Sequence, residues 1–323
     1  MARQVSADEV RDGVSLTNLG QTLFEGSGVT KRELVDYLDA VCERILPVLR
    51  DRPLSVVRVL RGQEPFMQKN VPRYAPPWVQ TVPLWAETSR RQVSYALCND
   101  RRTLLWFANQ RAVEYHPTLI RADRWDHPTD LVLDIDPPAE NQAGGFGLAV
   151  RAAHLVRQVL AEAGLVGVVK TSGAKGVHVF VPVEAGATLE EVAAATRALA
   201  ARAELIDPAL ATTAYLREDR GGKVFLDSTR AGGATVVAVY SPRVRPGTPV
   251  SFPVAWDQLD RVAAADFTVR TAARLVAEAD PWADQLPEPQ RLGSELIEEG
   301  RAIPVARVQA MHEGKRRARA RRG

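Results

Sequence analysis

Cysteine and long apolar runs are both scarce in this sequence. Its 323 residues include two cysteines, Cys42 and Cys98, which lack the CxxC spacing of a zinc or redox site and do not indicate a disulfide framework. No stretch approaches the roughly 20 apolar residues that a membrane helix needs. The first residues, MARQVSADEVRDG, lack the apolar core of a signal peptide. These absences predict a cytoplasmic protein without membrane contact.

An excess of charge of one sign is also missing, except at the C-terminus. The formal net charge is +3, from 42 basic and 39 acidic residues. The last ten residues, GKRRARARRG, carry these basic side chains: Lys315, Arg316, Arg317, Arg319, Arg321 and Arg322. Without them the acidic residues would be in excess. Such a run is typical of an arm that binds a phosphate backbone, and a solvated tail is the alternative.

The first third of the chain predicts a mixed α/β module. Residues 30–50 have apolar side chains at helical intervals, and Thr30 and Glu33 have the spacing of a capping box. Pro47 is expected to end or kink this helix. Three further elements are expected: strands at 55–60 and 93–97, and a helix over 103–117 that stops at its proline.

From residue 131 onward the pattern becomes regular. It predicts a strand at 131–136, a helix at about 148–163, strands at 166–172 and 177–183, a helix at about 189–204, and strands at 223–229 and 234–241. The order βαββαβ is that of the ferredoxin-like unit, which RNA-recognition modules also use. We therefore predict an α+β protein with three parts: an N-terminal α/β module at 1–125, an RRM-like core with its closing segments at 126–290, and an extension with the basic tail at 291–323.

Acidic residues interrupt two of the apolar strands. In LVLDIDPP (131–138), Asp134 and Asp136 point to the same face, since side chains alternate along a strand. Asp227 lies in another apolar run, VFLD, on a strand that the topology places next to the first. Carboxylates suit Mg²⁺ or Mn²⁺, and two such ions can activate a hydroxyl and stabilise a leaving pyrophosphate. Salt bridges to arginines are the alternative explanation.

The stretch KTSGAKGVHVFVP (170–182) predicts a phosphate-binding turn. Ser172, Lys175 and His178 supply a hydroxyl, a charge and an imidazole to phosphates, although an ordinary hairpin would have the same pattern. It is not a Walker A motif, because the spacing and the following helix are missing. Cations cluster near Asp227: Arg217, Arg220, Lys223, Arg230, Arg243 and Arg245. Carboxylates beside many cations favour phosphoryl transfer with a triphosphate substrate.

Several of these motifs, in this order, resemble the polymerase domain of bacterial ligase D, of the archaeo-eukaryotic primase superfamily. They are LVLDIDPP, TSGAKGVHV, and GKVFLDSTR followed by YSPRVRPGTPVSFPVAWDQL. The resemblance runs from LTNLGQTLF (16–24) to about residue 260. It implies a primase-like core and template-directed addition of nucleotides, preferably ribonucleotides, to a primer 3′-OH. The chain is expected to act as a stand-alone polymerase, because nothing in it resembles a ligase or nuclease motif.

The resemblance also implies roles for individual residues. Asp134, Asp136 and Asp227 would be catalytic and would bind two Mn²⁺ or Mg²⁺ ions. Nucleotide-binding roles fall to Ser172, Lys175, His178, Arg243 and His116, and the cations that bracket Asp227 add Arg220 and Arg230. DNA-binding roles fall to Asn18, Lys31, Phe66, Met67 and Lys69. The implied partners are gapped or broken duplex DNA, NTP or dNTP, and a DNA ligase and an end-binding protein in trans, for a monomer at the bacterial nucleoid.

The sequence departs from this family at two DNA-binding positions. Gln21 replaces a lysine that the family often has, which removes one charged contact to a 5′-phosphate. Met67 replaces an aromatic that can stack on a base, a contact typically worth about 1–3 kcal/mol. Two alternatives remain open at this stage: a non-catalytic nucleic-acid-binding module on a primase scaffold, and a primase that starts chains de novo.

Overall fold

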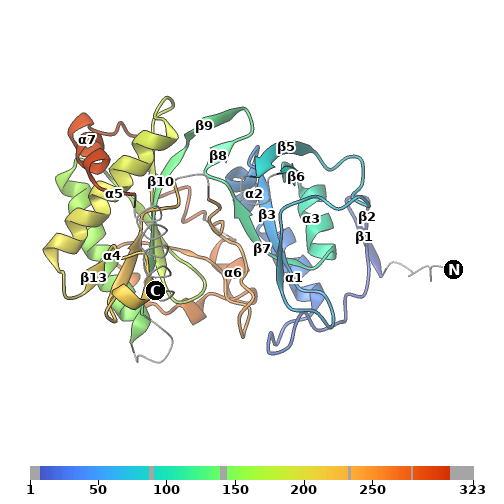
Figure 1. Ribbon diagram of the computed structural model, residues 1–323. Helices are drawn as coiled ribbons and strands as arrows, with labels where there is room; N and C mark the ends of the chain where they lie inside the picture. Colours follow the sequence, from blue (N-terminus) through green and yellow to red (C-terminus); the bar gives the residue numbers. More distant parts are fainter. Residues whose placement is uncertain (1–7, 87–90, 139–143, 232–233, 278, 306–323) are drawn as a thin grey trace, which may run out of the picture.

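The chain folds as two α/β halves that lie side by side (Figure 1). The structure is a computed structural model and describes residues 8–86, 91–138, 144–231, 234–277 and 279–305. The predicted basic tail lies outside the described residues. Within those ranges, every helix is too short or too polar to cross a lipid bilayer.

The N-terminal half is built on a five-stranded sheet with the order β4-β3-β6-β5, and β7 also pairs with β3. The strands are β3 (Leu54–Arg58), β4 (Phe66–Gln68), β5 (Thr81–Ala86), β6 (Arg91–Ala96) and β7 (Ala112–Pro117). A hairpin of β1 (Glu9–Arg11) and β2 (Val14–Leu16) precedes them. Three helices pack on one another beside the sheet: α1 (Lys31–Ala40), α2 (Cys42–Leu49) and α3 (Arg101–Asn109).

The helix predicted over 30–50 is two helices. The capping box is confirmed, because the Thr30 side chain accepts from the Glu33 amide and Glu33 bonds back to the Thr30 amide. The chain breaks at Val41, however, and Pro47 lies inside α2. Proline removes one backbone hydrogen bond, and burial of Ile45 and Leu49 in the core stabilises α2 despite that loss. The expectation that Pro47 ends the helix was wrong, and the alternative expectation of a kink stays a prediction.

The helix predicted over 103–117 is also wrong in its second half. Helix α3 ends at Asn109, Arg111 takes a left-handed conformation with φ of 61°, and the chain continues as β7. Residues 112–117 form a strand because they pair with β3. The periodicity of a local segment cannot predict such long-range pairing. The change matters for function because it places Glu114 and His116 on a strand.

The second half contains a six-stranded sheet with the order β13-β14-β10-β12-β11-β15. The strands are β10 (Asp130–Asp136), β11 (Val168–Thr171), β12 (Val177–Pro182), β13 (Ala211–Thr212), β14 (Val224–Asp227) and β15 (Pro253–Val254). The predicted ferredoxin-like arrangement is confirmed, since β10 and β12 are central and β14 lies beside β10. The short outer strands β13 and β15 were not expected.

Two long helices, α4 (Gly145–Glu162) and α5 (Leu189–Ile206), cover one face of this sheet. The capping box predicted at the start of α5 is confirmed. Helix α7 (Ser294–Ala302) packs on α5, and Gly300 approaches it so closely that a Cβ would lie 1.8 Å from the Ala194 carbonyl oxygen. Smaller elements complete the fold: β8 (Ile120–Arg121), β9 (Arg124–Pro128), η1 (Arg217–Asp219), η2 (Leu259–Arg261), η3 (Ala264–Asp266) and α6 (Ala272–Leu275).

The strand predicted at 234–241 is wrong. Its described residues, from Ala234 onward, form a single bridge, between Thr235 and Thr118. Two amides still bond to β7, from Val236 to the Pro117 carbonyl and from Ala238 to the Tyr115 carbonyl, at 3.1 and 2.9 Å. This segment therefore ties the second half of the molecule to the first along β7.

Candidate active site

Four polar side chains lie in one row across the second sheet. Strand register pairs Asp134 with Asp227 on β14 and with His178 on β12, and pairs His178 with Lys170 on β11. Cross-strand partners point to the same face, so the four side chains lie on one face of the sheet. All four side chains are buried. The predicted gathering of Asp134, Asp227 and His178 is thus present, and Lys170 joins it.

Lys170 was missed by the sequence analysis. The signal was available, because a lysine inside the apolar strand VGVVKTS is as unusual as an aspartate inside LVLDIDPP. A buried charge requires polar partners. Lys170 has two, since its Nζ lies 2.9 Å from His178 Nδ1 and 2.6 Å from Ser251 Oγ.

Each carboxylate oxygen of Asp134 has one partner, an imidazole on one and a guanidinium on the other. His178 Nε2 lies 3.2 Å from its Oδ1, and Arg230 Nη2 lies 2.7 Å from its Oδ2. Burial alone would raise the pKa of Asp134, but His178 and Arg230 outweigh burial and hold that pKa well below its usual range. Asp134 is therefore an ionised carboxylate at the centre of the row.

Asp136, at the end of β10, behaves in the opposite way. Burial and the neighbouring charge of Asp134 raise the pKa of Asp136 to about 6. Two carboxyl groups of one strand thus have divergent proton affinities, a pattern concentrated at functional sites.

The donor set suits a hard divalent cation. Among the described residues, no group of three or more His, Cys, Asp and Glu side chains is close enough to hold a metal as it stands. The Arg230 guanidinium occupies the space between two of the carboxylates, because Nη2 contacts Asp134 Oδ2 and also Asp227 Oδ2, at 3.1 Å. These carboxylates already converge on one positive charge, and oxygen-only ligands favour Mg²⁺ or Mn²⁺. The residues present therefore fit such an ion once Arg230 moves.

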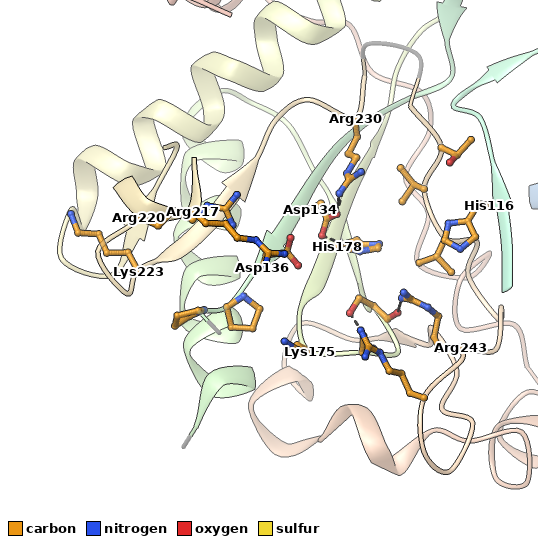
Figure 2. A pocket seen from close by; sticks show the side chains of 18 of the residues that line it. His116, Asp134, Asp136, Lys175, His178, Arg217, Arg220, Lys223, Arg230 and Arg243 are labelled. Carbon is orange, nitrogen blue, oxygen red and sulfur yellow. Dashed lines mark hydrogen bonds and ion pairs between the residues drawn. The ribbon is translucent and has the colours of Figure 1, made fainter. Parts of the chain in front are cut away.

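A cavity of about 940 Å³ opens above the row and is rich in cations. Figure 2 shows Asp134, Asp136 and His178 at its centre, with Arg217, Arg220 and Lys223 on one side, Lys175 and Arg243 on another, and His116 opposite. Arg220 stacks on the Phe225 ring, 3.6 Å from its centroid, and donates to two backbone carbonyls. The cavity lining thus includes every predicted nucleotide-binding residue together with Asp134 and Asp136. Asp227 does not line the cavity but lies beside Asp134 across the sheet.

The turn between β11 and β12 forms part of the cavity wall. Ser172 Oγ accepts from the amides of Ala174 and Gly176 at 3.2 and 3.1 Å. Gly173 has a φ of 65°, and at Gly176 a Cβ would lie 2.1 Å from the Ile135 carbonyl oxygen. The glycines therefore let this turn lie directly against the strand that carries Asp134 and Asp136.

His178 lies differently from the sequence prediction. Both of its ring nitrogens are engaged within the protein, Nε2 with Asp134 and Nδ1 with Lys170. Burial and the neighbouring lysine lower the pKa of His178 to about 4. In this arrangement His178 positions a carboxylate, and its expected direct contact with a triphosphate stays a prediction.

Glu114 is a second site residue that the sequence analysis missed. From β7, its Oε2 lies 2.8 Å from His116 Nε2 and 3.2 Å from Arg243 Nε, and Oε1 accepts from the Val244 amide at 2.8 Å. Burial would raise the pKa of Glu114, but His116 and Arg243 outweigh burial and lower it to about 2. Arg243 also donates to the Ser172 carbonyl. One carboxylate thus orients cavity residues from both halves of the protein.

The predicted DNA-binding residues lie in the N-terminal half and do not line this cavity. Phe66 and Met67 on β4 are exposed, as is Asn18, which has a φ of 54°. Lys31 is instead buried, and its Nζ donates to the Thr17 carbonyl and to Asn109 Oδ1. Burial lowers the pKa of Lys31 to about 8. Contacts of these residues and of Lys69 with DNA remain predictions.

Comparison of the sequence with protein families gives a match over most of the chain. The family described as LigD, primase-polymerase domain, matches residues 30–282. The chain belongs to this family. The resemblance deduced from the motifs is confirmed, and with it the enzyme class of DNA-directed nucleotidyltransferases.

Relatives of the LigD polymerase family extend this result. The chain is 32% identical over 289 residues to the bifunctional non-homologous end joining protein LigD of Bacillus subtilis, covering 87% of this chain and 45% of that protein. It is 32% identical over 266 residues to the multifunctional LigD of Mycobacterium tuberculosis strain H37Rv, covering 79% of this chain and 34% of that protein. The chain thus spans less than half the length of these relatives.

A solved structure supports the fold assignment. The polymerase domain of Mycobacterium tuberculosis ligase D in complex with DNA matches with a TM-score of 0.76 and 29% identity, covering 84% of this chain and 97% of that one. The predicted primase-like α+β fold is therefore confirmed.

Proposed function

We propose that this protein is a metal-dependent, template-directed polymerase that adds nucleotides, preferably ribonucleotides, to a primer 3′-OH in short gaps or at broken DNA ends. The row of Asp227, Asp134 and His178 under a cation-rich cavity is the observation that carries the proposal. A binding module without catalysis would gain nothing from clustered carboxylates, which repel phosphate.

Each group of side chains has a task in this reaction. Asp134, Asp136 and Asp227 would hold two Mn²⁺ or Mg²⁺ ions, which when bound favour the alkoxide form of the primer hydroxyl and neutralise the leaving pyrophosphate. Arg243, Lys175 and Ser172 bind the triphosphate, and the opposite cations, Arg217, Arg220 and Lys223, bind further phosphate charge. Arg230 keeps the carboxylates together until the ions arrive.

The partners follow from the same assignment. The DNA substrate is gapped or broken duplex, bound by the exposed β4 side chains Phe66 and Met67. The relatives carry end-joining names, and a DNA ligase and an end-binding protein are therefore part of the proposal. The protein would act as a monomer at the bacterial nucleoid.

Primer extension tests the function directly. The protein is incubated with Mn²⁺ and a duplex that contains a short gap, with each ribo- or deoxyribonucleotide supplied singly. We expect extension by the template-matched nucleotide, faster with ribonucleotides, and none in the presence of a chelator. Absence of extension by a folded, DNA-binding protein would contradict the proposal and favour the binding-module alternative, whereas dinucleotide synthesis on an unprimed strand would indicate a primase.

The raised pKa of Asp136 predicts that Mn²⁺ binding depends on pH. Below its pKa of about 6 this carboxyl is protonated, and a metal ligand must lose its proton. The affinity should rise with pH by up to about tenfold per unit below that pKa and level off above it, because one proton is displaced per ion. Electron paramagnetic resonance of free Mn²⁺ measures the affinity. In Asp136→Asn the dependence should vanish, and a flat profile in the wild type would contradict the role of Asp136.

Glu114→Gln should weaken nucleotide binding. The substitution keeps the shape but removes the charge that orients His116 and Arg243. We expect KM for the nucleotide to rise about tenfold, equivalent to about 1.4 kcal/mol, with a smaller change in kcat. Glu299→Gln, which breaks an ion pair with Arg202 far from the cavity, is the control and should change neither constant. An unchanged KM in Glu114→Gln would show that Glu114 has no role in nucleotide binding.

A further inference from the structure

Lys170 has an environment that packing alone does not explain. The side chain is fully buried in β11, where an apolar residue of the same length would avoid the cost of desolvating an amine. Its Nζ lies 2.6 Å from Ser251 Oγ, 2.9 Å from His178 Nδ1 and 5.5 Å from the centre of the Phe180 ring. It lines neither the cavity nor the protein surface. Its influence on the site must therefore pass through His178.

The hydrogen bonds around Lys170 have a single consistent direction. Ser251 Oγ donates to the Thr171 carbonyl at 2.8 Å, so it accepts from Lys170 Nζ. At the other end of this series of hydrogen bonds, Asp134 is an ionised carboxylate and can only accept a hydrogen bond. His178 Nε2, which faces it, must therefore carry the proton.

The remaining nitrogen of His178 is then determined. With a proton on Nε2, a second proton on Nδ1 would create an imidazolium whose Nδ1 lies 2.9 Å from the lysine nitrogen, inside a buried strand pair. Burial makes even one positive charge costly here, and it lowers the pKa of both His178 and Lys170, so a protonated imidazolium beside the lysine nitrogen is strongly unfavourable. Nδ1 is therefore the acceptor of a Lys170 N–H, and the hydrogen-bonded series runs from Lys170 through His178 to Asp134.

We propose that Lys170 is a positioning residue that fixes His178 in the Nε2–H tautomer and thereby fixes the orientation of the Asp134 carboxylate for metal binding. The metal-binding part rests on the proposed function. A metal-ligating group is commonly oriented by a hydrogen-bonded partner behind it, and loss of such a partner typically weakens metal binding about 10–100-fold. In this protein the partner is itself oriented by a buried lysine.

The tautomer is measured first on the metal-free protein, where catalysis plays no part. The ¹⁵N chemical shifts of His178 at neutral pH should report one neutral Nε2–H tautomer with a hydrogen-bonded Nδ1. This measurement requires no variant. An Nδ1–H tautomer, or an imidazolium, in the wild type would overturn the proposal.

Lys170→Met then removes the donor while keeping the length of the side chain. We expect loss of the Nδ1 hydrogen-bond shift, mixed tautomers, and Mn²⁺ affinity about 10–100-fold weaker. Ser251→Ala, which removes the other partner of Lys170, should leave the His178 tautomer unchanged and is the matched control. If Lys170→Met is folded and retains both the tautomer and the Mn²⁺ affinity, Lys170 has no positioning role, although the polymerase proposal survives. If neither protein binds Mn²⁺ or extends primers, the proposed function fails instead.

Discussion

Asp134→Asn should abolish primer extension while the protein stays folded. Asp134 is the centre of the polar row, with partners on both oxygens, and asparagine has the same shape without the charge. Charge stabilisation by a correctly held metal is worth several kcal/mol in the transition state, so we expect a loss of about a thousandfold or more, at about 1.4 kcal/mol per tenfold. Single-turnover extension of a gapped duplex with Mn²⁺ measures it.

Asp130→Asn is the matched control for this experiment. Asp130 lies on the same strand and the same face as Asp134, but it is paired with Arg52, at 3.6 Å, and does not line the cavity. Its extension rate should stay close to that of the wild type. Activity retained in Asp134→Asn, with the same thermal unfolding as the wild type, would remove Asp134 from the reaction.

Gly176→Ala should produce the largest loss of stability. Gly176 precedes β12, and an added Cβ would lie 2.1 Å from the Ile135 carbonyl oxygen, on the central strand β10. Backbone cannot rotate away as a side chain can, so either the sheet or the turn must shift. We expect the free energy of unfolding to fall by about 3 kcal/mol, near the upper end for overpacking, together with a loss of extension because Ile135 lies between Asp134 and Asp136. Urea denaturation measures the change.

Gly147→Ala is the control for the steric argument. Gly147 lies in helix α4, and its added Cβ would meet no atom within 4 Å. Alanine favours the helical backbone, so this variant should be stabilised by about 0.5–1 kcal/mol. Equal stability of Gly176→Ala and the wild type would mean that β10 and the turn move apart at little cost.

Interactions between near neighbours in the chain were predictable. The capping boxes at Thr30 and Thr188 depend on residues three positions apart, and both are present. The alternation that gives Asp134 and Asp136 one face is a property of any strand. The βαββαβ order of the second half followed from periodicity, and the family followed from motifs within single segments.

Long-range pairing decided the rest. The segment 112–117 is a strand because β3 lies beside it, and 234–241 is not a strand because it forms a single bridge. The roles of Lys170 and Glu114 could not be predicted, because they depend on contacts with residues far away in the sequence, Ser251 and Arg243. The register that places Asp227 beside Asp134, with Arg230 between them, comes from the whole sheet.

By itself, then, the sequence determined the types of side chain, the local elements that carry them and the family. Only the tertiary structure determined which polar groups form hydrogen bonds and ion pairs with one another and which of them line the cavity. The physical reason is that buried polar groups must find partners, and in a sheet built from distant strands those partners are set by register rather than by sequence spacing.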